Sequence, residues 1–138
     1  MKKILKIFFG PYKKKYKKKR PTISLGLDKK EYQNKKNEFL VIANKKTVFF
    51  NEFYKFEYNK ISIRNQKTRW GSCSSRKSLN FNYRIFLLSE DLMDYIIVHE
   101  ICHLQEMNHS KSFWDLVEKK IPDYKKKRLE LKKYYFIN

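Results

Sequence analysis

The sequence predicts a small mixed α+β domain, on three observations. Between Asp28 and Phe53 apolar residues recur at three- and four-residue steps, which indicates an amphipathic helix. Two stretches, at residues 61–64 and 79–85, alternate apolar with polar residues, which is typical of half-buried strands. Residues 92–104 are apolar nearly all round, which indicates a buried helix. With 138 residues the chain is expected to form one domain with a core of its own.

The first helix is expected to begin after Asp28, because an aspartate at the N-cap satisfies free backbone N–H groups. Its apolar face is expected to belong to the core and comprises Phe39, Leu40, Ala43, Thr47, Phe50 and Phe53. The two strands are separated by Lys67–Ser78, which is rich in serine and contains Gly71. This arrangement predicts a β-hairpin, or a small sheet, with a long structured loop.

Three further signals place the later helices. Ser89 is followed by two acids, so it is expected to cap the buried helix with its hydroxyl. Ser110 is expected to cap a helix that runs to about Lys119, and Pro122 to open a last helix that ends near Phe136. Residues 1–27 contain a Gly10-Pro11 break and the basic run Lys13–Arg20. We interpret them as an N-terminal arm, and residues 28–138 as the single domain.

The formal net charge of +19 raises the question of a nucleic-acid partner. Of the 33 basic residues 27 are lysines and six are arginines, whereas specific phosphate recognition favours arginine. The chain is also rich in Lys, Asn, Ile, Phe and Tyr and has a single alanine, Ala43. Codons rich in A and T specify those abundant residues, so drift in base composition explains the charge at least as well. A weak polyanion or nucleic-acid contact through the basic surface therefore stays open as an alternative.

Two cysteines are too few for a disulfide-stapled scaffold and suit a reducing compartment. The N-terminus begins like a signal peptide, but Lys6 interrupts its apolar run and no small-residue cleavage site follows. No apolar stretch approaches the length of a membrane span. We therefore expect a cytoplasmic protein with no membrane partner.

His99-Glu100-Ile-Cys-His103 is an H-E-x-x-H motif on the predicted buried helix. Positions i and i+4 differ by about 40° around a helix, so both imidazoles project from one face and can share one cation. Glu100 lies beside His99, where it can hold a water molecule instead of the metal. An unligated pair of histidines would be costly among large apolar residues. The motif therefore predicts a hydrolytic zinc centre with one ion and an open coordination position.

The spacing leaves the third ligand undecided. His109 can reach the metal only if the helix ends near Met107-Asn108, where Asn108 tolerates a left-handed C-cap. Glu106 lies seven residues after His99, so on a continuing helix it falls on the same face as both histidines. Geometry alone therefore favours neither His109 nor Glu106 as the third metal ligand.

The segment from His99 to Trp114 includes Asn108-His109-Ser110 and Phe113-Trp114. It resembles the signature of the YgjP-like metallopeptidase domain (domain of unknown function 45), akin to the SprT-like and M48-type zinc peptidases. Arg69-Trp70-Gly71-Ser72-Cys73 and Leu79-Asn80-Phe81-Asn82 resemble two further elements of that family. The resemblance covers roughly residues 56–128 and implies a small zincin-like fold. It also implies that His109 is the third zinc ligand and that the substrate is a peptide or protein.

In the expected reaction, Glu100 acts as general base toward an activated water. Arg69, Tyr83 and Arg84 are candidates, on their chemistry only, for contact with the substrate or the transition state. Two alternatives use the same motif differently: a metal-dependent nucleoside triphosphate pyrophosphohydrolase, and a nucleic-acid-associated module with structural zinc. Structural zinc favours four protein ligands, whereas only three histidines are present.

Overall fold

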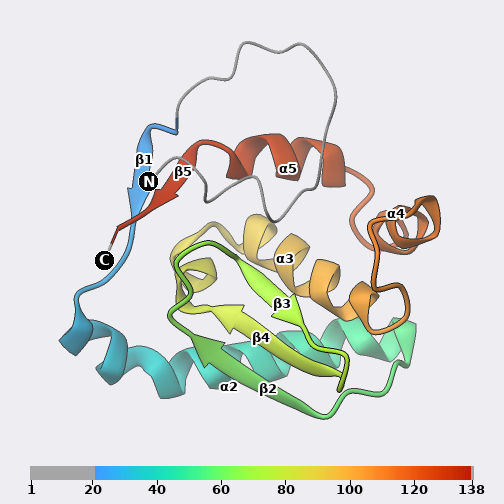
Figure 1. Cartoon of the computed structure of the whole chain (residues 1–138), viewed down its shortest axis with the longest axis horizontal. Coiled ribbons are helices and arrows are strands. Elements are labelled where there is room, and N and C mark those ends of the chain that lie inside the picture. Colours follow the sequence, from blue (N-terminus) through green and yellow to red (C-terminus); the bar gives the residue numbers. More distant parts are fainter. Residues whose placement is uncertain (1–20, 138) are drawn as a thin grey trace.

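The computed structural model describes residues 21–137 (Figure 1). The basic run Lys13–Arg20 and the Gly10-Pro11 break therefore lie outside the described residues. The mixed α+β prediction is confirmed. The elements, in chain order, are β1 (Ile23–Leu25), α2 (Lys29–Tyr54), β2 (Lys60–Arg64), β3 (Gly71–Cys73), β4 (Ser78–Asn82), the 3-10 helix η1 (Tyr83–Leu87), α3 (Glu90–His103), α4 (Lys111–Glu118), α5 (Tyr124–Leu131) and β5 (Tyr134–Phe136).

Helix α2 begins where the sequence predicts. Asp28 accepts a hydrogen bond from the backbone N–H of Glu31, and the Glu31 carboxylate accepts one from the N–H of Asp28, which is a capping box. The expected core face is largely buried, but Phe53 is half exposed with the Lys120 ammonium 4.5 Å from its ring centroid. The helix ends at Tyr54 and is capped by Lys55, which adopts a left-handed conformation.

The three-stranded sheet has the order β2-β4-β3, and α2 and α3 both pack against it (Figure 1). The predicted hairpin between residues 61–64 and 79–85 is wrong in its pairing, because β2 and β4 run parallel. The chain between them crosses to the far edge and forms β3, which pairs antiparallel with β4. The tight turn therefore lies at Ser74–Lys77, where Lys77 has φ 61° and its N–H donates to the Ser74 carbonyl.

Strand β4 ends three residues earlier than predicted. The Asn82 side chain accepts a hydrogen bond from the Arg84 N–H at 3.0 Å and so caps η1. The Asn82 amide also donates to the carbonyls of Gln66 and Arg69, at 2.7 and 2.8 Å. A fully buried asparagine thus holds the crossing segment against the sheet.

Helix α3 lies at the centre of the described fold and packs against β3, β4, α2, α4 and α5. Ser89 is its N-cap residue, but the expected hydroxyl bond is absent from this structure. The helix ends at His103, before Met107-Asn108, so it does not continue to Glu106. None of the described helices is long and apolar enough to cross a bilayer.

The last helix is shorter than predicted, because α5 ends at Leu131 and the expected helical stretch to Phe136 is β5. Strand β5 pairs parallel with β1, which lies in the predicted arm. Aromatic residues favour strands, and Phe136 buries its ring against Trp70 with 4.6 Å between centroids. The division into residues 1–27 and 28–138 stays a prediction.

Arg84 joins this second sheet to the rest of the domain, and its side chain is fully buried. Its guanidinium donates to the carbonyls of Leu25, Gln66 and Ile137 and to the Asn65 side chain. Burial lowers the pKa of Arg84 below its usual range. A buried charge of this kind is tolerated because its hydrogen bonds are satisfied.

We predict that Arg84→Met lowers the free energy of unfolding by about 3 kcal/mol, because four acceptors around the guanidinium lose a charged donor. Urea denaturation followed by circular dichroism measures the change. Arg76→Met, in the exposed β3–β4 turn, is the matched control and should change stability by less than about 0.5 kcal/mol. Equal effects in both variants would contradict the structural role of Arg84.

Candidate metal centre

Helix α3 carries three polar side chains into the core near its C-terminal end. His99, Glu100 and His103 are 1%, 2% and 8% exposed. The rest of the helix is built from large apolar residues, and those buried with them are Leu92, Tyr95, Ile96, Ile97, Val98, Ile101 and Cys102. Burying unpaired polar groups here is costly, so the arrangement of these three side chains needs a physical explanation.

The Nε2 atoms of His99, His103 and His109 form a nearly equilateral triangle. Its sides are 3.2 Å for His99–His103, 3.2 Å for His103–His109 and 3.1 Å for His99–His109. A neutral imidazole nitrogen offers either one proton or one lone pair, so three mutual contacts cannot all be hydrogen bonds. Three lone pairs directed at one cation satisfy all three atoms together.

The triangle fits a zinc ion. Zn–N bonds of about 2.0–2.1 Å in a tetrahedral site place the nitrogens about 3.3 Å apart, close to the observed spacing. The other ring nitrogens have partners that orient the rings: His103 Nδ1 lies 2.9 Å from the Glu106 carbonyl, and His99 Nδ1 lies 3.3 Å from the Tyr95 hydroxyl. A carbonyl accepts only, so it fixes the His103 proton on Nδ1 and leaves Nε2 with its lone pair.

The electrostatics also favour neutral rings. Burial lowers the pKa of His99 well below its usual value, and burial lowers that of His103 as well. Burial, together with the charges of His103 and Arg128, lowers the pKa of His109 to about 4. Neutral imidazoles are the form that binds a metal, so the site is prepared for a cation at neutral pH.

The loop after α3 brings His109 to the other two histidines. Because the helix ends at His103, the chain turns back before Ser110, whose hydroxyl accepts a hydrogen bond from the Phe113 N–H at 3.3 Å and caps α4. Asn108 does not adopt the left-handed conformation that it would tolerate, since only Lys55 and Lys77 have positive φ among the described non-glycine residues. The Glu106 carboxylate does not belong to the histidine cluster. Glu106 instead contacts His103 through its backbone carbonyl.

Glu100 lies against β3. Burial raises the pKa of its carboxyl group to about 8, although the positive charge of Arg69 opposes the shift. A Cβ placed on Gly71 would lie 3.0 Å from Glu100 Cγ and 3.0 Å from the Asn80 carbonyl oxygen. A larger residue at position 71 would therefore require the Glu100 side chain or the β4 backbone to shift by a few tenths of an ångström.

Aromatic rings from α4 enclose the histidines. The Phe113 ring centroid lies 4.9, 4.4 and 5.0 Å from those of His99, His103 and His109. The Trp114 ring stacks on His109 at 5.7 Å with an interplanar angle of 22°. These contacts agree with a packing role around the cluster. Cys102 faces Tyr54 instead of the cluster, and burial raises the pKa of its thiol to about 12.

The candidate contact residues are placed differently from one another. Arg69 is exposed and near enough to Glu100 to affect its pKa. Arg84 is directed to backbone carbonyls on the side of β1 and β5, as described above. The Tyr83 hydroxyl accepts a hydrogen bond from the Leu27 N–H at 2.9 Å. For Tyr83 and Arg84 the structure thus supplies structural partners, and their catalytic roles stay predictions.

Three residues near the centre were not predicted from the sequence to lie there: Tyr95, Gly71 and Arg128. Tyr95 stands four residues before His99, so the i, i+4 rule could have placed its hydroxyl on the same helix face. Gly71 is predicted from the sequence only as part of a loop and of a family motif, without contact with Glu100. No local signal points to Arg128, which comes from α5 and approaches the histidines through tertiary packing.

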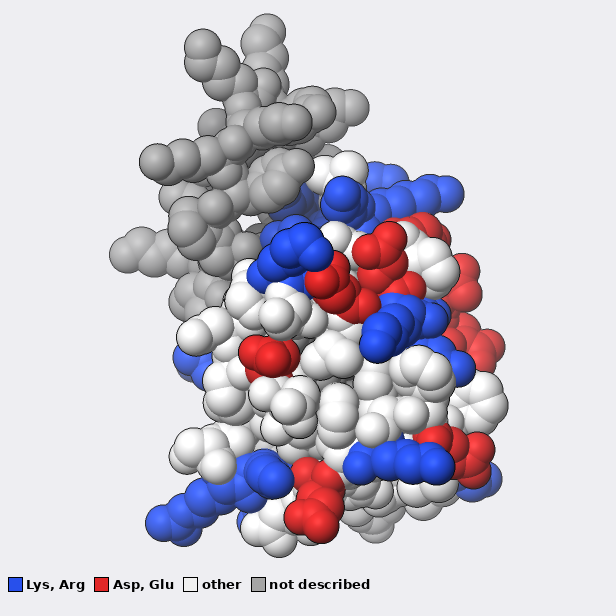
Figure 2. Space-filling model, turned by 90° about the vertical axis from the view of Figure 1, so that its right-hand side faces the viewer, with Lys and Arg blue, Asp and Glu red and all other residues white. Residues whose placement is uncertain are grey.

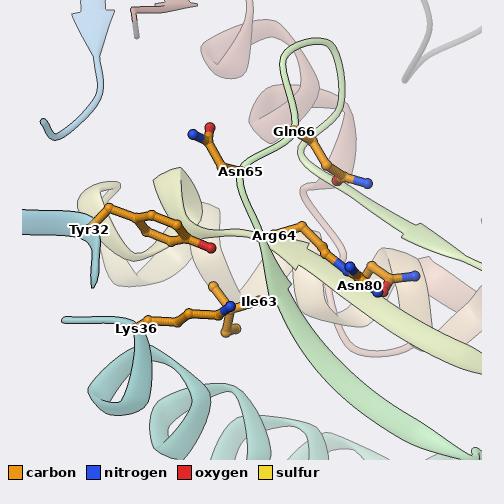
Figure 3. Close-up of a pocket in the computed structure, with 7 residues that line it drawn as sticks. All are labelled: Tyr32, Lys36, Ile63, Arg64, Asn65, Gln66 and Asn80. Carbon is orange, nitrogen blue, oxygen red and sulfur yellow. The ribbon is translucent and has the colours of Figure 1, made fainter. Parts of the chain in front are cut away.

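A separate polar groove lies between α2 and the end of β2 (Figure 3). It is open, with a volume of about 580 Å³, and it contains neither the three histidines nor Glu100. Its lining residues are Tyr32, Lys36, Ile63, Arg64, Asn65, Gln66 and Asn80. On the face of the molecule in Figure 2, Lys and Arg alternate with Asp and Glu and do not gather into one basic patch.

The profile of the YgjP-like metallopeptidase domain family matches residues 13–134, so the chain belongs to this family. Two solved structures resemble the fold. The abylysin metallopeptidase zymogen of Pyrococcus abyssi is 24% identical with a TM-score of 0.59, and the match covers 69% of this chain and 99% of that one. The jannalysin metallopeptidase zymogen of Methanocaldococcus jannaschii is 24% identical with a TM-score of 0.53, and the match covers 67% and 92%. Among curated proteins no significant match was found.

We predict that His109→Ala weakens binding of zinc by more than about 100-fold, since loss of a direct ligand should exceed the 10–100-fold cost of losing an outer partner. Competition with a chromophoric chelator measures the affinity. Glu106→Ala keeps the backbone carbonyl and should bind zinc like the wild type. The opposite ranking of the two variants would identify Glu106 as the ligand.

Proposed function

We propose that this protein is a zinc-dependent metallopeptidase of the H-E-x-x-H type, in which His99, His103 and His109 hold one zinc ion. The observation that supports this most directly is the triangle of Nε2 atoms beside a buried carboxylate. A zinc ion held by three neutral imidazoles supplies Lewis-acid chemistry: it polarises a carbonyl group and makes water more acidic.

Glu100 is the general base in this proposal. A buried carboxyl group with a raised pKa binds a proton more strongly than an ordinary glutamate, which suits the removal of a proton from water. The same carboxyl group then delivers that proton to the leaving amine. Because a pKa of about 8 leaves the group mostly protonated at pH 7, the carboxylate form would depend on the added positive charge of a bound zinc ion, which acts in the same direction as the charge of Arg69.

A peptide substrate is favoured by the position of β3. Within the described residues β3 is an edge strand of its sheet, and its Gly71 lies against Glu100. An extended peptide can add to such an edge by main-chain hydrogen bonds, which would carry a scissile bond past the carboxylate. Family membership points the same way and favours peptide over phosphoanhydride hydrolysis.

We predict that Glu100→Gln lowers the rate of casein cleavage by at least about 100-fold while zinc content stays unchanged, since the amide cannot accept the proton. Cleavage is followed by gel electrophoresis, and zinc by elemental analysis of the same samples. Glu106→Gln makes the same chemical change outside the histidine cluster and should retain activity. A fully active Glu100→Gln protein would refute the general-base role.

A second prediction concerns the space beside β3. Gly71→Ala should reduce cleavage by about tenfold or more, because the new Cβ displaces the Glu100 side chain and misaligns the base. Zinc affinity should remain near the wild-type value, since the Cβ does not touch the histidines. Ser72→Ala, on the neighbouring residue, is the control and should cleave casein normally. Normal turnover by Gly71→Ala would show that Glu100 needs no such space.

A further inference from the structure

A cation from a distant part of the chain lies close to the histidines. Arg128 is in the last turn of α5, and its Cζ atom lies 4.3 Å from the centroid of the Trp114 ring. The Trp114 ring is itself 5.7 Å from the rings of both His99 and His109. The guanidinium is therefore within about 10 Å of both imidazoles, a distance at which charges still interact in a partly buried site.

Arg128 is among the residues around the histidines that reach solvent. His109 is exposed, and Trp114 and Arg128 are half-buried, whereas Glu100 is buried on the side of β3. His109 and Arg128 are thus both open, at least in part, to solvent.

This placement is unfavourable for a cation site on its own. A positive charge beside three histidines opposes the binding of a divalent cation by direct repulsion. The same charge becomes favourable once a negatively charged ligand atom is present, because the ligand then lies between two positive groups. The indole holds the guanidinium plane, and arginine presents a fork of N–H donors suited to carboxylate or tetrahedral oxyanions.

We propose that Arg128 is the anion-binding residue of the metal centre, which contacts a negatively charged oxygen of the bound ligand on the side of His109. The inference rests on the proposed function, in which that oxygen belongs to the tetrahedral species formed from the scissile carbonyl. The carboxylate of a substrate or product end has the same chemistry, and the test below separates the two sources.

The experiment uses the full chain loaded with Co²⁺, whose visible spectrum reports on the metal site without any need for turnover. Inorganic phosphate, a tetrahedral anion, and acetate, a planar carboxylate, are titrated into the wild type, Arg128→Gln, Arg128→Lys and Lys126→Gln. Lys126→Gln removes the same charge from an exposed position on the same helix and controls for the overall field. Co²⁺ affinity is measured for each protein beforehand.

Arg128→Gln should bind phosphate about tenfold more weakly than the wild type and Co²⁺ about threefold more tightly, because the repulsion is removed. Arg128→Lys should restore part of the phosphate affinity, and Lys126→Gln should match the wild type in both. A larger loss for phosphate than for acetate assigns the tetrahedral oxyanion, and the reverse assigns a carboxylate end.

Arg128→Gln is expected to weaken phosphate binding and to strengthen Co²⁺ binding. A merely structural role would give a different result, since damage to the Trp114 packing would weaken the binding of both the anion and the metal. Unchanged phosphate affinity in Arg128→Gln, or an equal loss in Lys126→Gln, overturns the inference, as does weaker Co²⁺ binding by Arg128→Gln. If the wild type binds Co²⁺ and cleaves casein in those cases, the proposed function stands and only the role of Arg128 fails. If the wild type binds no Co²⁺, both fail.

Discussion

The described fold depends on one constraint: three imidazole nitrogens converge at the end of a buried apolar helix and cannot satisfy one another. His99 and His103 are on α3, whose remaining surface is committed to packing, so neither ring can turn toward solvent without loss of core contacts. The loop to Ser110 places the third ring at the same point. A cation shared by the three rings would offset the free-energy cost of burying their unpaired nitrogen atoms.

Elements governed by neighbouring residues could be predicted from the sequence. Asp28 and Glu31 define the start of α2, and Ser110 defines the start of α4, because caps act over three residues. The i, i+4 spacing likewise placed His99 and His103 together. Nothing nonlocal was needed for these assignments.

Features decided by tertiary contacts could not be predicted in this way. The parallel pairing of β2 with β4 depends on where the crossing segment goes, and Asn82 fixes that segment from within the core. The alternation that placed Arg84 on a polar strand face was real, but η1 begins there and the side chain is buried. The helical reading of residues 132–136 failed because pairing with β1 outweighs local helix preference.

The centre is also electrically asymmetric, with Arg69 near the carboxylate of Glu100 and Arg128 near the histidines. Metallopeptidase chemistry needs both a base that keeps its charge and a place for developing negative charge. Two arginines from separate elements, a loop before β3 and helix α5, would serve these needs independently. In this proposal the base and the anion contact are tuned by different residues.

Zinc K-edge X-ray absorption of the loaded protein tests the central claim most directly, since it counts and identifies the atoms bound to the metal. The account predicts three imidazole nitrogens at about 2.0–2.1 Å, completed by oxygen and without sulfur. A spectrum with cysteine sulfur, or with fewer than three imidazoles around the ion, would contradict it.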